Sequence, residues 1–378
     1  MAEVITGVGM HPFGRFPGKS AIDLAVQAVL EALRDADVQW SEIDALFCAH
    51  MYAGTGAGHK LATLLGRTGI PIVNIENACS SGGAALQLAR QAVASGQHRR
   101  VVAIGLEKMP RGFIDMDYFE PWRRRSGHAV NPAQFALPIQ RHMHDYGTTA
   151  QQLAAVAAKN HRHSVHNDRA MYRRVIEPDE ILASPMVCDP LRLLMLCAPN
   201  EGAAAAVIEA RAPRAGDVVI QGAGLRTATR WQTFGEHMPT SVPATSDEVE
   251  SVTHAAAGEA YAQSGLGPDD VDVAEVQDTD SGGEIIATEE LGFCRRGLGG
   301  EIAESGLTSL GGPLPINPSG GLLSKGEPVG ASALGQVYEI ANQLRDRCGA
   351  RQVDGARTGL THSLGAGGNA SVLILTRS

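Results

Sequence analysis

Several residue types and patterns that mark whole classes of protein are scarce in this sequence. Aromatic residues make up only 4% of its 378 residues, and acidic residues outnumber basic ones to leave a formal net charge of −9. Phosphate binding needs a clustered positive surface, so nucleic acid is not expected as a partner. Residues 1–7 lack the basic and apolar regions of a signal peptide, and no apolar run approaches the ~20 residues of a membrane helix. The sequence therefore favours a cytoplasmic protein with no membrane partner.

Cysteine patterns that would bind zinc or form a disulfide framework are also missing. Six cysteines are scattered along the chain without C-x-x-C spacing, and the histidines near them lack zinc-ligand spacing. Scattered thiols in a chain of this length favour a reduced compartment over disulfides. Most free cysteines are buried structural residues, and that interpretation is sufficient for all of them except Cys79. The others are Cys48, Cys188, Cys197, Cys294 and Cys348.

Glycine and small apolar residues are abundant instead. The 44 glycines and the 44% of hydrophobic residues indicate a sizeable core with close packing of helices on sheets. Strand-like and helix-like patterns alternate, which predicts an α/β fold with βαβ units and a mainly parallel sheet. The predicted strands cover residues 4–8, 43–48, 72–75, 101–105, 202–210, 218–224, 271–276 and 370–375. The predicted helices cover residues 21–36, 59–65, 79–95, 132–146, 150–163, 248–264, 283–291 and 332–345.

The domain organisation follows from where this alternation restarts. After residue 246 the pattern begins afresh, which suggests two halves of similar plan. We predict an N-terminal half over residues 1–235 and a C-terminal half over residues 236–378. Residues 108–190 break the rhythm and are rich in Arg, His, Met and Tyr. This segment is predicted to be an insertion that caps a site.

The first candidate functional residue is Cys79, which follows a predicted strand and opens a predicted helix. It lies in the segment Asn77–Gly83, where small residues on both sides let backbone and substrate approach closely. Free N–H groups at a helix start stabilise a thiolate and can lower a cysteine pKa from ~8.5 to roughly 3.5–7.5. The same N–H groups could hold an oxyanion. We expect Cys79 to be a nucleophile, and a buried structural cysteine is the alternative.

Two glycine-rich segments in the C-terminal half are predicted to be loops. Residues 317–332 must turn tightly before the helix at Ser332, and Glu327 lies there on constrained backbone between a glycine and a proline. Residues 362–368 precede the last strand. Either loop alone is consistent with a simple turn. Two such loops together with the Cys79 turn form a more specific pattern. Neither loop matches the phosphate-binding pattern G-x-x-x-x-G-K-[ST].

Over nearly the whole chain these segments resemble the thiolase superfamily, and within it the sterol-carrier-protein-type (lipid-transfer) thiolases. Asn77–Gly83 looks like the nucleophile turn of that family, and residues 105–109 resemble the strand end that follows it. The most specific match is at residues 317–336, where the family has Asn-Pro-Ser-Gly-Gly followed by Ser-Lys-Gly-His-Pro. Further similarity occurs at residues 146–160, 189–191, 202–204 and 362–368.

The resemblance implies a duplicated thiolase fold with five α-β-α-β-α layers and an insertion (loop) domain. It implies an acyl-CoA C-acyltransferase in which Cys79 attacks a thioester or a 3-oxoacyl-CoA and holds the acyl group. Coenzyme A is then part of the substrate, and no tightly bound cofactor is expected. The family is normally dimeric, and many thiolase-like proteins work with a small OB-fold, zinc-ribbon subunit. A homodimer and such a partner are therefore implied as well.

Several positions depart from the family's pattern. Glu327 replaces the histidine of Gly-His-Pro, and Thr279 and Ser363 stand where the family has its second acid/base cysteine. Glu327 can act as a base, but when ionised it cannot stabilise an oxyanion and it opposes a nearby thiolate. Gln277 stands where the family has an oxyanion-binding Asn or His, and its amide could still donate a hydrogen bond. His362 is a nearby candidate for the missing base.

Contacts with the CoA ester are predicted at two places. The one compact basic cluster, at residues 123–125, suits the phosphates of CoA, and a solvated basic loop is the alternative. Small residues of the two glycine-rich segments are predicted to line the substrate site. The predicted binding residues are Arg123, Arg124, Arg125, Ser319, Gly320 and Gly367.

Three functions stay open at this point. The first is acyl transfer, with cleavage or formation of a C–C bond, through an acyl-enzyme at Cys79. The second is a thiolase-like retro-aldolase that cleaves a CoA ester, for example one with a steroid side chain, without an acyl-enzyme. Retention of Cys79 weighs against it. The third is a non-catalytic subunit that binds acyl-CoA or a partner, which the altered base positions favour and the intact nucleophile turn disfavours.

Overall fold

The computed structural model describes residues 1–112, 121–127, 129–228 and 250–378. The strands are β1 (Ala2–Gly14), β2 (Ala45–Ala49), β3 (Ile72–Ile75), β4 (Arg100–Lys108), β5 (Met186–Cys188), β6 (Leu191–Arg192), β7 (Glu201–Arg211), β8 (Val218–Thr227), β9 (Val273–Glu275), β10 (Thr358–Gly365) and β11 (Asn369–Arg377). The helices are α1 (Ala21–Asp35), α2 (Ala57–Leu65), α3 (Ser81–Ala94), α4 (Pro121–Arg125), α5 (Asn131–Tyr146), α6 (Ala150–Ser164), α7 (Pro178–Ala183), α8 (Val252–Ser264), α9 (Ser281–Glu290), α10 (Gly299–Glu304), α11 (Gly321–Lys325) and α12 (Ser332–Leu344).

The strand order shows that one plan occurs twice. In the described part of the chain, nine strands form a sheet in the order β3-β2-β4-β7-β1-β8-β11-β10-β9. Outward from the central pair, β1 and β8, come β7 and β11, then β4 and β10, then β2 and β9. A single parallel bridge between Ala274 and Ile316 occupies the place in the second half that β3 occupies in the first. This mirrored order confirms the predicted duplicated fold.

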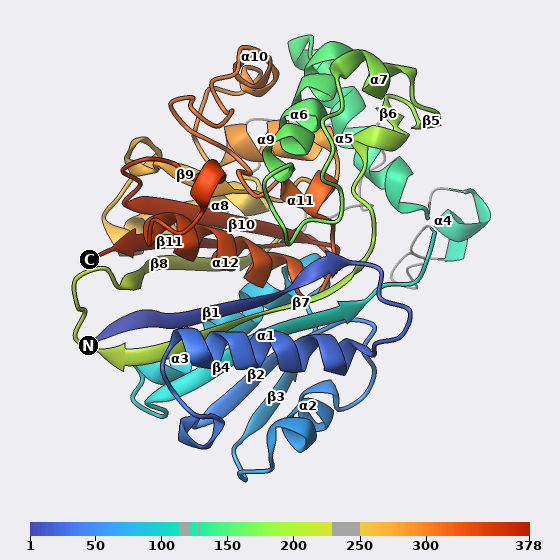
Figure 1. Ribbon diagram of the computed structural model, residues 1–378. Coiled ribbons are helices and arrows are strands. Elements are labelled where there is room, and N and C mark those ends of the chain that lie inside the picture. Colours follow the sequence, from blue (N-terminus) through green and yellow to red (C-terminus); the bar gives the residue numbers. More distant parts are fainter. Residues whose placement is uncertain (113–120, 128, 229–249) are drawn as a thin grey trace.

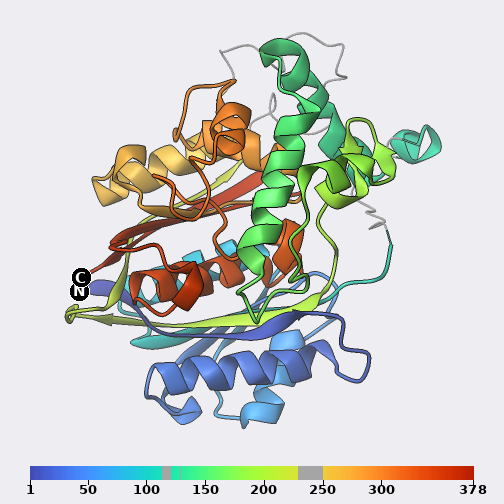
Figure 2. The same ribbon diagram turned by 45° about the horizontal axis from the view of Figure 1, so that its top comes forward.

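Helices form three layers around this sheet (Figures 1 and 2). The helices α1 and α2 cover the outer face of the first half, and α8 and α9 cover that of the second. The helices α3 and α12 lie between the halves, where Leu86 and Leu334 share one core with strands of both. The predicted α-β-α-β-α layers are therefore confirmed. The two β layers are continuous, because β1 pairs with β8 at Val4 and Ile5.

Local sequence explains the outer helix α1. The Ser20 hydroxyl accepts a hydrogen bond from the Asp23 backbone N–H, and the Asp23 carboxylate accepts one from the Ser20 N–H. This capping box fixes the helix start that the sequence predicts. A Cβ atom on Gly9 would lie 2.2 Å from the carbonyl oxygen of Ala28, so the glycine lets α1 rest directly on β1.

A similar close approach joins the half that carries Cys79 to the loop that precedes α12. A Cβ atom on Gly105, in β4, would lie 2.2 Å from the carbonyl oxygen of Gly330. A Cβ atom on Gly330 would in turn lie 2.7 Å from the Cα atom of His50. The backbones of the two halves therefore touch without intervening side chains at the edge of the central layer.

The elements between β4 and β7 form a cap beside the second half (Figure 1). Helices α5, α6 and α7 share a core with α9, in which Ile139, Leu153 and Ile285 are buried. Across the described ranges, no helix is long and apolar enough to cross a membrane.

Two predicted loops contain regular structure. Residues 362–365 belong to β10, which pairs with β11 from Thr358 to Gly365, so only the short turn at 366–368 remains outside the two strands. The glycine content of this segment predicts a loop, but pairing with β11 holds residues 362–365 in a strand. Residues 317–332 include the short helix α11. The division at residues 235 and 236 stays a prediction, since residues 229–249 lie outside the described part.

Candidate active site

Cys79 lies on a 3₁₀ turn, Ala78–Ser80, between β3 and α3. Ala78 has a left-handed φ of 48°, which costs a non-glycine residue on the order of 1 kcal/mol. The Ser81 hydroxyl closes this turn, because it donates to the Ala78 carbonyl at 2.6 Å and accepts from the Asn77 N–H at 2.7 Å. The turn holds the half-buried Cys79 sulfur toward Glu327 of the other half.

Glu327 is the buried centre of the site. Its side chain is 4% exposed, and its carboxyl group interacts with Cys79, Cys197, Gln277 and Thr279. One carboxyl oxygen, Oε2, accepts a hydrogen bond from Cys197 Sγ at 2.9 Å. The other, Oε1, accepts one from Gln277 Nε2 at 2.7 Å. The structure therefore brings together three of the predicted site residues, Cys79, Glu327 and Gln277, around one carboxyl group.

Cys197 is a site residue that sequence reasoning missed, since it is predicted to be a structural thiol. Its segment runs between the two loops of the second half: Leu196 bridges to Asp280, and Pro199 bridges to Glu327. The Cys197 backbone N–H also donates to the Thr279 carbonyl at 2.9 Å. No local pattern marks the residue, because its contact with Glu327 spans 130 positions of sequence.

The electrostatics of this cluster overturn one expectation. Burial and the adjacent Glu327 charge raise the pKa of the Cys79 thiol well above its ordinary value. The backbone N–H groups of Cys79 and Ala366 lower this pKa, but by less. The predicted fall in the Cys79 pKa at a helix start is therefore wrong, because a carboxyl group stands beside the sulfur. The same causes, burial and Glu327, raise the pKa of Cys197.

Glu327 is the carboxyl group that contacts both thiols. Burial raises the pKa of its carboxyl group, and hydrogen bonds from Cys197, Cys79 and Gln277 lower it by less. A carboxylate with a raised pKa is a stronger base, so proton transfer from a thiol in contact becomes less costly. Burial thus favours the neutral form of both the Cys79 thiol and the Glu327 carboxyl group, which lie in contact.

The side-chain amide of Gln277 holds the Glu327 carboxyl group, and both of its N–H groups already donate hydrogen bonds. Its Nε2 donates to Glu327 and, at 2.8 Å, to Thr279 Oγ1, so the predicted oxyanion contact is corrected: both amide hydrogens are used within the site. The Gln277 Oε1 atom is buried and has no hydrogen-bond partner within the described residues. Thr279, at the position of a family cysteine, contacts the same carboxyl group.

The predicted base His362 lies behind Gln277 and is only 1% exposed. Its Nδ1 accepts from the Gln277 backbone N–H at 3.4 Å, and its Nε2 lies 3.0 Å from Thr253 Oγ1. Burial lowers the pKa of His362 to about 3, so its ring is neutral near pH 7. The ring nitrogen holds the Gln277 backbone, and the base role of His362 stays a prediction. Ser363 is likewise internal, with its hydroxyl 3.0 Å from that of Ser80.

Buried carboxylates hold the loop that leads to Glu327. Glu275 accepts from the Ser319 backbone N–H at 2.9 Å, from its hydroxyl at 2.7 Å and from Lys325 Nζ at 3.1 Å. Asp278 accepts from the backbone N–H groups of Leu322 at 2.6 Å and Leu323 at 3.2 Å, which lie in the first turn of α11. These hydrogen bonds fix both the start and the end of α11.

The glycines of this loop make room for those contacts. A Cβ atom on Gly321 would lie 2.0 Å from Asp278 Oδ2, and one on Gly320 would lie 2.5 Å from Ser164 Cβ. Ser319 is completely buried, and Gly320 faces the cap. The predicted substrate contacts of Ser319 and Gly320 are therefore corrected: both residues build the loop and present nothing to a bound ester.

The remaining predicted binding residues lie at other places. Gly367 has a φ of 89° in the turn between β10 and β11, next to Ala366, whose N–H approaches the Cys79 sulfur. Arg124 and Arg125 are exposed on α4, at the outer end of the cap in Figure 1. The side chain of Arg123 lies outside the described residues. Binding of CoA by these residues stays a prediction.

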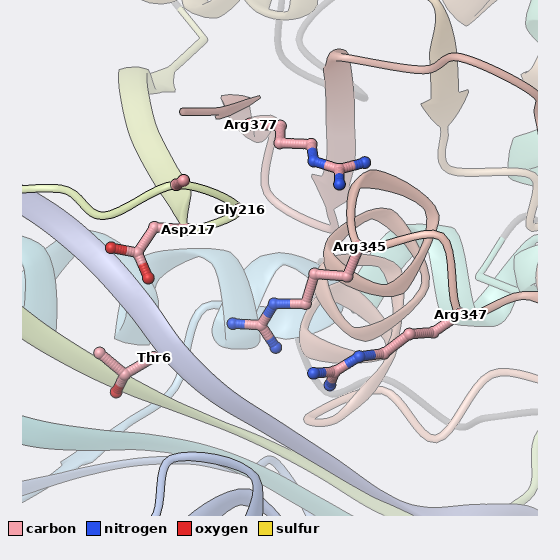
Figure 3. Close-up of a pocket in the computed structure, with 7 residues that line it drawn as sticks. Thr6, Gly216, Asp217, Arg345, Arg347 and Arg377 are labelled. Atoms are coloured by element: carbon pink, nitrogen blue, oxygen red, sulfur yellow. The ribbon is translucent and has the colours of Figure 1, made fainter.

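A separate cavity lies near the two chain ends (Figure 3). Each of its arginines has an acidic partner: Arg345 and Arg347 share Asp35 at 2.7 and 2.6 Å, and Arg377 pairs with Asp346. It shares no lining residue with the Cys79 cluster. Within the described ranges, no group of three His, Cys, Asp or Glu residues is placed to hold a metal ion.

Comparison with known proteins gives matches over both halves. The family described as "Thiolase, N-terminal domain" matches residues 3–211, and "Thiolase C-terminal domain-like" matches residues 236–377. An acetyl-CoA acetyltransferase of Methanothermobacter thermautotrophicus is 37% identical and covers 99% of both chains. Sterol carrier protein 2 of Homo sapiens is 35% identical over 96% of this chain and 70% of its own.

Solved structures agree with this assignment. An Ltp2-ChsH2(DUF35) aldolase superposes with a TM-score of 0.86 at 27% identity, over 100% of this chain and 98% of that one. The Acat5 thiolase from Ascaris suum, in complex with coenzyme A, superposes with a TM-score of 0.70 over 100% of both chains. At 18% identity, the second comparison speaks for the fold alone.

The charge of Glu327 is expected to suppress the reactivity of Cys79 toward alkylation. Glu327→Gln removes that charge, so the Cys79 pKa should fall and iodoacetamide should label Cys79 faster at pH 8. Peptide mass spectrometry over a pH series measures the rate at each cysteine. Glu304→Gln, on the exposed end of α10, is the control. Slower labelling of Cys79 in Glu327→Gln would contradict this electrostatic account.

Proposed function

Because the chain belongs to the thiolase superfamily, we propose that it is an acyl-CoA C-acyltransferase that carries the acyl group as a thioester on Cys79. The observation that supports this most directly is the contact of the Cys79 thiol with the buried Glu327 carboxyl group. A nucleophile in contact with its base is the arrangement that covalent acyl transfer requires. The substrate class is a thioester of coenzyme A, with CoA as substrate and no resident cofactor.

The geometry suggests how the altered site performs the first step. Glu327 takes the proton of Cys79 while the sulfur attacks the carbonyl carbon, and Gln277 holds the carboxyl group in place. The backbone N–H groups of Cys79 and Ala366, which already approach the sulfur, are the donors we assign to the oxyanion. They replace the side-chain donors that Glu327 and Gln277 cannot supply.

Covalent catalysis predicts an acyl adduct on Cys79. We expect acetoacetyl-CoA to add an acetyl group to the wild-type protein, detectable by intact mass, and Cys79→Ala to remove it completely. Glu327→Gln should slow adduct formation by about 10²-fold or more, the scale of a lost general base. Cys348→Ala, which replaces a buried cysteine, is the control variant and should form the adduct at the wild-type rate. A Cys79-independent adduct, or no adduct with any acyl-CoA, would refute the proposal.

A retro-aldolase is the second candidate. It is favoured by the similarity to the Ltp2-ChsH2(DUF35) aldolase and by a carboxyl base at residue 327, which can remove a hydroxyl proton. It would cleave a β-hydroxyacyl-CoA without an adduct, and Cys79→Ala would retain its rate. A purely non-catalytic subunit would give neither adduct nor cleavage in the same assays.

Arg124 and Arg125 are proposed, with Arg123, to bind the phosphates of CoA. Their cluster is exposed on α4 and concentrates positive charge in a chain of net charge −9. Reversal of all three to Glu should raise the KM for acetoacetyl-CoA at least tenfold with little change in kcat, because the contact is remote from the thiol. The same reversal of Arg67, exposed beyond α2, is the control. An unchanged KM would show that the three arginines do not bind the phosphates of CoA.

We also propose a homodimer of the cytoplasm that binds a small OB-fold, zinc-ribbon subunit. The open edge of the sheet at β3, where Val73 is 42% exposed, supports pairing of two copies. The partner is supported by the two-component name of the aldolase to which this chain is similar. Purification from its native cells followed by light scattering should yield two copies with a second polypeptide. A fully active homodimer without one would exclude the partner.

A further inference from the structure

The site holds a second thiol whose position no part of the proposed function yet uses. Cys197 Sγ lies 2.9 Å from Glu327 Oε2, and Cys79 contacts the same carboxyl group. Like Cys79, Cys197 is only partly buried as a residue. Of the other cysteines, Cys48 and Cys348 are buried in the core. Acyl transfer through Cys79 needs only one thiol beside Glu327, so the presence of Cys197 at the same carboxyl group calls for a second role.

The backbone shows that this placement is fixed. Residues 196–199 are held on one side by the bridge of Leu196 to Asp280 and on the other by the bridge of Pro199 to Glu327. The Glu327 N–H donates to the Ala198 carbonyl at 3.3 Å. Cys197 and Glu327 are therefore connected through both backbone and side chain, and their separation is set by the fold.

The other candidates for an acid at the reacting carbon are already occupied. Ser363 is 2% exposed, with its hydroxyl against that of Ser80, and His362 is neutral and buried behind Gln277. Thr279 Oγ1 accepts from Gln277 Nε2. A hydroxyl is also less acidic than a thiol in the same surroundings. Cys197 is the acidic proton donor that remains at the carboxyl group.

We propose that Cys197 is a second catalytic residue, which gives a proton to and takes a proton from the α-carbon of the acyl-CoA, and that Glu327 passes protons between Cys79 and Cys197. This inference rests on the proposed function and assigns the acid/base of its carbon–carbon step. It makes Glu327 a relay between two thiols, a role for which its two carboxyl oxygens and central position are suited.

The proton balance closes without any further reactant. In the cleavage direction, Glu327 takes the Cys79 proton as the sulfur bonds to the ketone carbon of a 3-oxoacyl-CoA. The C2–C3 bond breaks, and its electron pair stays on C2 as the enolate of the shortened acyl-CoA. Cys197 gives its proton to C2, and Glu327 returns the proton it holds to the Cys197 thiolate. A thioester on Cys79 has formed, and the original Cys79 proton is accounted for on Cys197.

The reverse of the C2 protonation can be measured alone. Wild-type protein in D₂O should exchange the methyl hydrogens of acetyl-CoA for deuterium, observed by mass spectrometry. Cys197→Ala should lower this exchange by about 10²-fold or more, while acetyl transfer from acetyl-CoA to Cys79 stays within about threefold. Cys79→Ala should retain the exchange, because removal of the α-proton requires only Cys197 and Glu327. Cys188→Ala, a partly buried cysteine of the cap, should match wild type.

The outcomes separate this inference from the proposed function. Failure of Cys79 to become acylated would refute acyl transfer, while exchange that depends on Cys197 would still stand. Exchange at the wild-type rate in Cys197→Ala, or no exchange in the wild type, would overturn the role of Cys197. If Cys197→Ala does not fold, Cys197→Ser retains a group that donates to Glu327, and its exchange should still fall at least tenfold. Wild-type exchange in a folded Cys197→Ser would then overturn the role.

Discussion

The buried carboxylates Glu275 and Asp278 impose the constraint on which the active site depends. Neither can lie in the interior without compensation, and the backbone N–H groups of α11 and the Lys325 ammonium group supply it. Satisfying these charges draws the loop at residues 317–326 down onto β9, so that the chain emerges at Glu327 in a fixed position. The Glu327 carboxyl group is thus placed by two other carboxyl groups, those of Glu275 and Asp278.

Three distant segments then meet at one group. The first half supplies Cys79 on a strained turn, the cap's return to β7 supplies Cys197, and the second half supplies Glu327 with Gln277. Substituting a carboxyl group for an imidazole changes the sign of the local charge. The Cys79 thiol is then stabilised in its protonated form. Under the proposed function, Cys79 must therefore be deprotonated by Glu327 during the reaction.

The sequence predicted what depends on local pattern. Strand–turn–helix at Cys79, the position of helix α1 and the two halves follow from periodicity and short motifs. The hydrogen-bond partners of Ser319, His362 and Cys197 lie 44, 109 and 130 positions away, so the environment of these residues could not be predicted from a single sequence. Glycines misled the assignment of residues 362–365, because there they permit close packing within a strand and do not mark a turn.

The sheet that joins the halves has a consequence for how the molecule is made. Strand β1 pairs with β7 and β8, roughly two hundred positions later, and β8 is completed only by β11 at the end of the chain. Such distant pairing carries a large loop-closure cost and folds slowly. During synthesis Cys79 leaves the ribosome long before Glu327, and until that residue arrives it is an ordinary thiol. The contact between Cys79 and Glu327 can therefore form only after both halves have been synthesised.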